Sequence, residues 1–66
     1  MLIFDNVKRY AKKRDISISK LERMSDLSKG TISKWNTVSP TADNLKRVAN
    51  NLKLKVDKLL EEGEEQ

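Results

Sequence analysis

The stretch SISKLERMSDLSKGTISKW, Ser17–Trp35, decides the fold of this 66-residue chain. Its pattern predicts two short helices joined by a turn of about three residues. Ser17 is a good N-cap for the first helix, although Ser19-x-x-Glu22 offers a rival capping box. Ser28 is an N-cap for a second helix that ends near residue 36. Two helices at this spacing form either a plain αα-hairpin or a helix-turn-helix that binds DNA.

Three further helices are expected around this pair, which predicts an all-α bundle of five short helices. In chain order the pair forms the second and third helices. The first helix runs from about residue 5 to residue 14 and is capped by Asp5 or Asn6. The fourth is capped by Thr41, and a short fifth helix lies around residues 56–60. Periodicity of 3.6 residues places apolar side chains inward: Val7, Tyr10, Ala11, Leu21, Met24, Ile32, Trp35, Leu45, Val48, Ala49 and Leu52.

Charge is distributed unevenly along the chain. Residues 1–60 carry all fourteen Lys and Arg but only six acidic residues, a net charge of +8, whereas EEGEEQ at the end carries four Glu. We therefore expect residues 1–60 to form the domain and residues 61–66 to form a disordered acidic tail. A body at +8 favours a polyanionic partner, although lysines that only solvate helix faces would give the same count.

Composition excludes several kinds of protein. The chain has no cysteine and no histidine, which removes disulfides, the commonest zinc sites and the commonest nucleophilic chemistry. The apolar run at the N-terminus stops at Asp5, too early for a signal peptide or a membrane span. We expect a soluble cytoplasmic protein that is not an enzyme, with no cofactor, no metal, no membrane contact and no small-molecule ligand.

The order of residue types carries a resemblance to a known family. Residues 17–35 resemble the helix-turn-helix of the lambda-repressor/Cro-like (Xre-type) family, and SPTADNLKRVANNLKLKVDKLL, residues 39–60, resembles that family's fourth and fifth helices. LSKGTISKW and SPTADNL are most similar to small repressors of phages and mobile elements in Gram-positive bacteria. The resemblance implies a bacterial repressor that binds double-stranded DNA at a two-fold operator as a dimer, with the helix near residues 28–36 in the major groove.

Four positions depart from the family pattern. Ile18 stands where glutamine usually contacts a phosphate. Glu22 replaces an alanine at a close helix crossing, so its side chain must point outward or accept a hydrogen bond from the turn. Asp26 replaces the glycine of the turn, and aspartate tolerates the left-handed conformation better than most residues. Asn36 replaces a glycine after the third helix and is expected to take its left-handed role.

The third helix supplies the candidates for base contact, which are Lys29, Gly30, Ser33 and Lys34. Gly30 has no side chain to hold the helix away from DNA, although it could also be a tolerated defect in an exposed helix. The two lysines can donate to O6 and N7 of guanine, or they contact phosphates only. Ser33 could contact a base edge or bond back to its own helix.

Seven residues are candidates for phosphate contact: Ser17, Ser28, Thr31, Thr37, Lys12, Lys13 and Arg14. The resemblance implies this role for the two threonines, whereas the two serines are caps first. The three cations attract DNA without sequence preference or simply solvate a helix end. Trp35 is expected in the core, not as a base-stacking platform. Tyr10 is expected at the core edge with its hydroxyl in water.

The last helix is the expected dimer contact, through Val56, Leu59 and Leu60, because one of its adjacent leucines can cover the core while the other faces a partner. The resemblance supports this role, and the small contact would leave the free protein monomeric. The alternative function is an antitoxin-like or anti-repressor module on the same fold. Such a module should present aromatic or Met anchors on the third helix, whereas Lys, Ser, Thr and Gly suit DNA.

Overall fold

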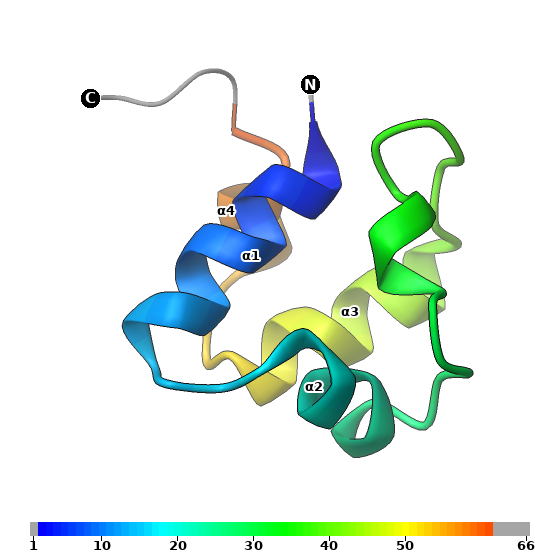
Figure 1. The fold of residues 1–66 in the computed structure, drawn as a ribbon. Helices are drawn as coiled ribbons and strands as arrows, with labels where there is room; N and C mark the ends of the chain where they lie inside the picture. Colours follow the sequence, from blue (N-terminus) through cyan, green and yellow to red (C-terminus); the bar gives the residue numbers. More distant parts are fainter. Residues whose placement is uncertain (1, 62–66) are drawn as a thin grey trace.

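Every regular element that the structure describes is helical. The computed structural model describes residues 2–61, and Figure 1 shows their arrangement. The elements are α1 (Ile3–Lys13), α2 (Ile18–Met24), the 3-10 helix η1 (Ile32–Lys34), α3 (Ala42–Asn51) and α4 (Val56–Leu59). The predicted all-α class is confirmed. The prediction of five α-helices is wrong for residues 2–61, because the third element is a single turn of 3-10 helix. None of these helices is long and apolar enough to span a bilayer.

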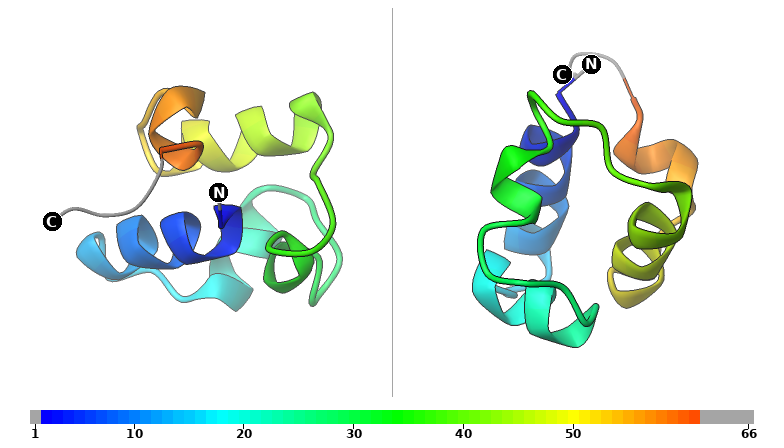
Figure 2. Two further views of the ribbon diagram at one scale, coloured as in Figure 1. Left: turned by 90° about the horizontal axis from the view of Figure 1, so that it is seen from above. Right: turned by 90° about the vertical axis from the view of Figure 1, so that its right-hand side faces the viewer.

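The helices form two layers around one core. Figure 2 shows α3 and α4 on one side and α1, α2 and η1 on the other. Each element contributes fully buried side chains to the space between them: Val7, Leu21, Ile32, Val48, Leu52 and Leu59. Trp35 is only 4% exposed, so its predicted place in the core is confirmed. Met24 is 44% exposed, because the buried side of α2 is formed by Leu21, Glu22 and Ser25, and the inward position expected for Met24 is wrong.

Three helix ends share one termination geometry. Asp15, Asp26 and Lys53 have φ values of 57°, 60° and 58°. The residue after each donates its amide to a carbonyl five positions earlier: Ile16 to Ala11, Leu27 to Glu22, and Leu54 to Ala49. These are Schellman ends, in which a partly buried apolar residue follows the left-handed one. The left-handed role expected of Asp26 is confirmed.

Local side-chain caps begin two helices. The Ser17 hydroxyl accepts from the Lys20 amide at 3.1 Å, and the Thr41 hydroxyl accepts from the Asn44 amide at 3.1 Å. Both predicted caps are confirmed, and the rival box at Ser19 is not used.

A distant residue caps α1 instead of a local one. The helix begins at Ile3, two residues earlier than expected. Oδ1 of Asn36 accepts from the amides of Phe4 and Asp5 at 2.9 and 3.4 Å. Asn36 does not adopt a positive φ, so its expected left-handed role is wrong. The expectation that Asp5 or Asn6 caps α1 is wrong as well, because the cap comes from the loop after η1.

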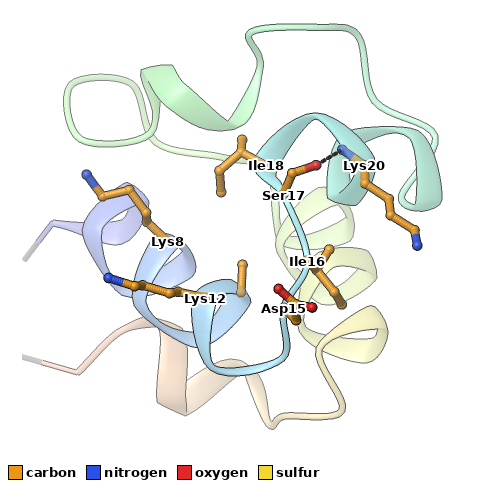
Figure 3. Close-up of a pocket in the computed structure, with 8 residues that line it drawn as sticks. Lys8, Lys12, Asp15, Ile16, Ser17, Ile18 and Lys20 are labelled. Atoms are coloured by element: carbon orange, nitrogen blue, oxygen red, sulfur yellow. Dashed lines mark hydrogen bonds between the residues drawn. The ribbon is translucent and has the colours of Figure 1, made fainter.

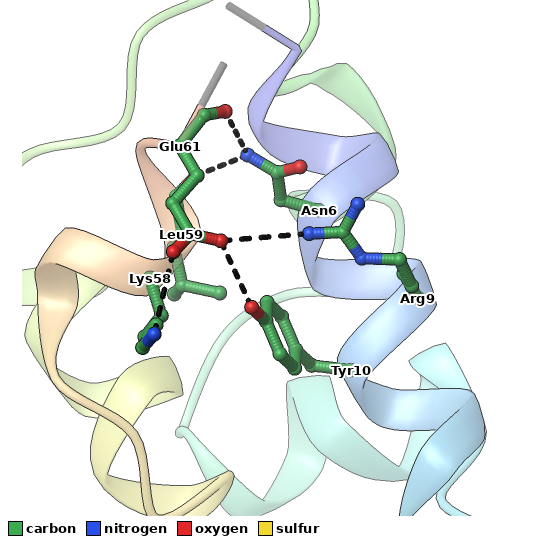
Figure 4. Close-up of polar contacts among 6 residues, drawn as sticks. All are labelled: Asn6, Arg9, Tyr10, Lys58, Leu59 and Glu61. Carbon is green, nitrogen blue, oxygen red and sulfur yellow. Dashed lines mark hydrogen bonds and ion pairs between the residues drawn. The ribbon is translucent and has the colours of Figure 1, made fainter. Parts of the chain in front are cut away.

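A buried amide ties α1 to the end of α4. Asn6 is 5% exposed, and its Nδ2 donates to the carbonyls of Leu59 and Glu61 at 2.8 and 2.9 Å. Figure 4 shows this clamp between the first and last helices. Because an unpaired buried amide would be costly, the polar side chain fixes the docking of α4 more specifically than apolar packing alone.

The Glu61 side chain extends this clamp. The Tyr10 hydroxyl donates to Oε1 of Glu61 at 3.0 Å, and Arg9 and Lys58 form ion pairs with the same carboxylate at 3.7 and 3.4 Å (Figure 4). The Tyr10 hydrogen bond is the largest cause that holds the pKa of Glu61 below its ordinary value; desolvation opposes it, and Lys58 and Arg9 lower the pKa further. The Tyr10 hydroxyl was expected to face water, but it is hydrogen-bonded to Glu61. Glu61 is held on α1 instead of starting a free tail, and residues 62–66 lie outside the described residues.

Candidate nucleic-acid interface

The segment expected to be a recognition helix is not an α-helix. We call residues 28–37 the recognition segment. It opens with a turn in which the Thr31 amide donates to the Ser28 carbonyl at 3.1 Å, and it continues as the 3-10 helix and further turns. Gly30 has φ +88°, a left-handed conformation that breaks an α-helix starting at Ser28. The expected helix to residue 36 is therefore wrong.

This geometry explains why Gly30 is a glycine. A Cβ at this position would meet nothing within 4 Å, so space does not restrict the residue. The positive φ does, because L-residues adopt it only at a cost. The interpretation of Gly30 as a glycine inside a helix is therefore wrong, and its role is to turn the backbone.

A buried carboxylate holds the start of the recognition segment. Glu22 is only 3% exposed. Its Oε2 accepts from the amides of Gly30 and Ile32 at 3.1 and 3.0 Å, and its Oε1 also lies 3.2 Å from the Gly30 amide. Glu22 was expected either to point outward or to accept a hydrogen bond from the turn after α2. It accepts hydrogen bonds, but the donors, Gly30 and Ile32, follow that turn in the sequence.

The other face of the recognition segment is polar and accessible. Lys29, Ser33 and Lys34 are exposed, whereas Ile32 and Trp35 fix the segment to the core. The Ser33 hydroxyl donates to the Gly30 carbonyl at 2.9 Å. A local hydrogen bond of this kind uses the hydroxyl proton, so Ser33 is a weaker candidate for base contact than the two exposed lysines.

The two threonine candidates differ in their surroundings. The Thr37 hydroxyl is exposed and donates to the Lys34 carbonyl at 3.2 Å. Thr31 is half-buried and precedes the 3-10 helix without capping it through its side chain. Both belong to the recognition segment with Ser28, so three of the seven phosphate candidates lie beside the base candidates.

A basic groove separates α1 from the start of α2. It has a volume of about 560 Å³ and combines an apolar floor with three lysines; its lining is Lys8, Ala11, Lys12, Asp15, Ile16, Ser17, Ile18 and Lys20. Figure 3 shows Lys8 and Lys12 on the α1 side and Lys20 on the α2 side, with their amino groups directed outward and not toward one point. This arrangement suits an extended polyanion better than a small anion.

Some of the predicted phosphate-contact residues line the groove and others do not. The groove brings Lys12 and Ser17 together, and it adds Lys8 and Lys20, which sequence reasoning missed. The spacing of Lys8 and Lys12, four residues on one helix, was a usable signal. Lys13 does not line the groove, and its amino group lies 5.4 Å from the centre of the Tyr10 ring.

A second hollow links α2 to the recognition segment. It measures about 320 Å³ and is lined by Ser19, Glu22, Arg23, Leu27 and Lys29. Arg23 therefore lies beside the base candidate Lys29, and it is another cation that sequence reasoning missed. Arg14, at the far end of α1, lines neither hollow.

Large apolar side chains are missing from the recognition segment's outer surface. Within residues 2–61, the exposed ones are Leu2, Met24 and Val38. None of them lies between residues 28 and 37, so this surface lacks the aromatic or Met anchors that a protein-binding face should present.

Comparison with known proteins identifies a family. The family model described as the Cro/C1-type HTH DNA-binding domain matches residues 6–62. No curated protein and no solved structure matches the chain. The matched region contains α2, the recognition segment, the basic groove and the second hollow.

Proposed function

Because the chain belongs to the Cro/C1-type helix-turn-helix DNA-binding domain family, we propose that it is a sequence-specific transcription regulator that represses genes by occupying an operator. The observation that carries this proposal is the pair of exposed lysines, Lys29 and Lys34, on a segment fixed to the core by Ile32 and Trp35. A backbone segment held on the core presents these two exposed donors from a defined position, and donors of this kind can pair with base edges in the major groove. The proposal assigns binding, and no catalysis, to the domain.

In this proposal, the recognition segment enters the major groove. Lys29 and Lys34 donate to O6 and N7 of guanine, and Gly30 keeps the backbone between them free of a side chain. The basic groove, with Lys8, Lys12 and Lys20, follows the adjacent phosphates. Phosphate contacts set the orientation on the duplex, while the recognition segment selects the sequence. Ser17, Ser28, Thr31 and Thr37 remain candidates for phosphate contact.

The proposed operator has two half-sites, each bound by one copy of the chain. Successive half-sites on one face of DNA lie roughly 34 Å apart. Val56 and Leu60 are half-buried and are the surface of α4 available to a partner, whereas Leu59 is fully buried in its own chain. So small a contact predicts a monomer in solution that pairs on DNA.

The test begins with a duplex selected by the protein from a random pool. Lys29→Ala and Lys34→Ala should weaken binding to this duplex more than binding to a scrambled duplex. Lys12→Ala and Lys20→Ala should weaken both equally and reduce the slope of log affinity against log salt by about one each. Lys55→Ala removes an exposed charge at the start of α4 and serves as the matched control. Affinity that does not change between low and physiological salt would exclude DNA binding of this kind.

A further inference from the structure

We propose that Glu22 is a positioning residue for DNA recognition, which fixes the direction of the lysines on the recognition segment without touching DNA. This inference rests on the proposed function and adds a determinant of specificity to it. Its basis is the set of hydrogen bonds from the Gly30 and Ile32 amides to the Glu22 carboxylate.

The start of the recognition segment depends on an outside acceptor. The first amides of any helix lack an acceptor within the helix. Here the 3-10 helix has no side-chain cap of its own, because Thr31 provides none. Glu22 supplies that acceptor from the preceding helix. The Ile32 amide is buried and the Gly30 amide is part-buried. Since buried amides are nearly always paired, the segment is stable in the orientation that keeps the Ile32 amide, and with it Gly30, on this carboxylate.

Glu22 is itself held firmly. It follows Leu21, which is fully buried, and the end of α2 is tied to α3 by a hydrogen bond of 2.9 Å from Asn51 Nδ2 to the Ser25 hydroxyl. The recognition segment is thus fixed by apolar packing of Ile32 and by the carboxylate beside it. Lys29 directly precedes Gly30, so any rotation of this turn changes where its ammonium group points.

Burial also resolves an electrostatic conflict. A carboxylate facing DNA would repel the phosphates, and Glu22 lines the hollow that Lys29 and Arg23 share. At 3% exposure, with its oxygens on backbone amides, the Glu22 charge is directed into the protein. The surrounding cations therefore remain available to a polyanion.

Two substitutions test the role of the carboxylate. Glu22→Gln keeps the length of the side chain, but its NH2 group replaces one acceptor and faces the Gly30 amide as a second donor. Glu22→Asp keeps the charge but is one methylene shorter. Asp57→Asn, at an exposed position on α4, makes the same change in net charge as Glu22→Gln and is the matched control.

The measured quantity is the ratio of affinities for the selected duplex and for a scrambled duplex at one salt concentration. We expect both Glu22 variants to lower this ratio by roughly tenfold, comparable to the loss of one well-placed base contact. Affinity for the scrambled duplex should change in Glu22→Gln only as much as it does in Asp57→Asn. If the folded variants keep the wild-type ratio, Glu22 has no positioning role.

A further measurement does not depend on the variants folding. In the wild-type protein, NMR should show slow amide hydrogen exchange at Gly30 and Ile32, and fast exchange at both would overturn the inference. A wild-type protein that selects no duplex would refute the proposed function and the inference with it. Selection with an unchanged ratio in the variants would refute the inference alone.

Discussion

Replacing Gly30 with alanine should destabilise the domain. Gly30 has φ +88°, and a Cβ there would meet nothing within 4 Å, so the cost comes from backbone conformation alone. An L-residue in a left-handed conformation costs roughly 1–2 kcal/mol. A helical Gly30 would give the opposite sign, because alanine in a helix interior is about 1 kcal/mol more favourable than glycine. The sign of the change therefore separates the two conformations.

Thermal and urea denaturation followed by circular dichroism measure this change. For a domain of this size, 1 kcal/mol shifts the melting temperature by about 4–8 °C, so Gly30→Ala should melt roughly 4–16 °C below wild type. A synthetic chain with D-alanine at position 30 is the matched control, because it adds the same methyl group but favours positive φ. It should be at least as stable as wild type. A stabilised L-alanine variant, or equal losses for both enantiomers, would refute the reasoning.

The remaining predictions concern the core, the pair contact and the Glu61 clamp. Trp35→Ala should lose about 3–5 kcal/mol, enough to abolish the helical circular dichroism of so small a domain, and a folded variant would contradict the buried position of the indole. Leu60→Glu should preserve the fold and non-specific binding but abolish cooperative binding to a two-half-site operator, as a gel shift would show; surviving cooperativity would place the pair contact elsewhere. The pKa of Glu61 is lowered in the folded protein, so its carboxylate stabilises the fold at pH values above the ordinary carboxyl pKa. This stability is lost as the pH falls through the folded pKa, so the free energy of unfolding should depend less on pH in the acid range in Glu61→Gln than in wild type. Tyr10→Phe removes the largest cause of that shift and should raise the Glu61 pKa measured by NMR.

Features that depend on local sequence were predictable. The hydroxyls of Ser17 and Thr41 cap the helices that follow them, because an N-cap contacts amides only two or three residues away. The apolar stripe from Leu45 to Leu52 lies in the core, since ten residues of α-helix are enough to establish a period. Asp26 adopts the left-handed conformation that its place in the turn requires.

Features that depend on tertiary contacts or on ambiguous spacing were not predictable. Ile32 and Trp35 are three residues apart, which suits a 3-10 helix as well as an α-helix, so the pattern could not exclude a left-handed Gly30. The Asn36 side chain caps α1 from a distance in sequence, because Phe4, whose amide it accepts, lies 32 positions earlier.

The candidate site shows the same division. Lys29 and Lys34 could be identified because they lie within the helix-turn-helix pattern. Lys20 was missed because only the packing of α1 beside α2 places it on the groove, whereas Lys8 lies on one helix face with Lys12 and could have been found. Glu22 was recognised as a departure from its family, but its partners became clear only with the backbone geometry.

The Asn6 clamp has a consequence for synthesis on the ribosome. Its partner carbonyl on Glu61 lies 55 positions later in the chain, so α1 cannot reach its final docking while the nascent chain ends before that residue. At about 5–20 residues per second, translation of this interval takes roughly 3–11 s. During that time, the apolar face of α1 has no α4 to cover it. The domain therefore completes its folding late, as one unit, and a nascent chain that stops short of Glu61 lacks one of the two carbonyls that pair with Asn6.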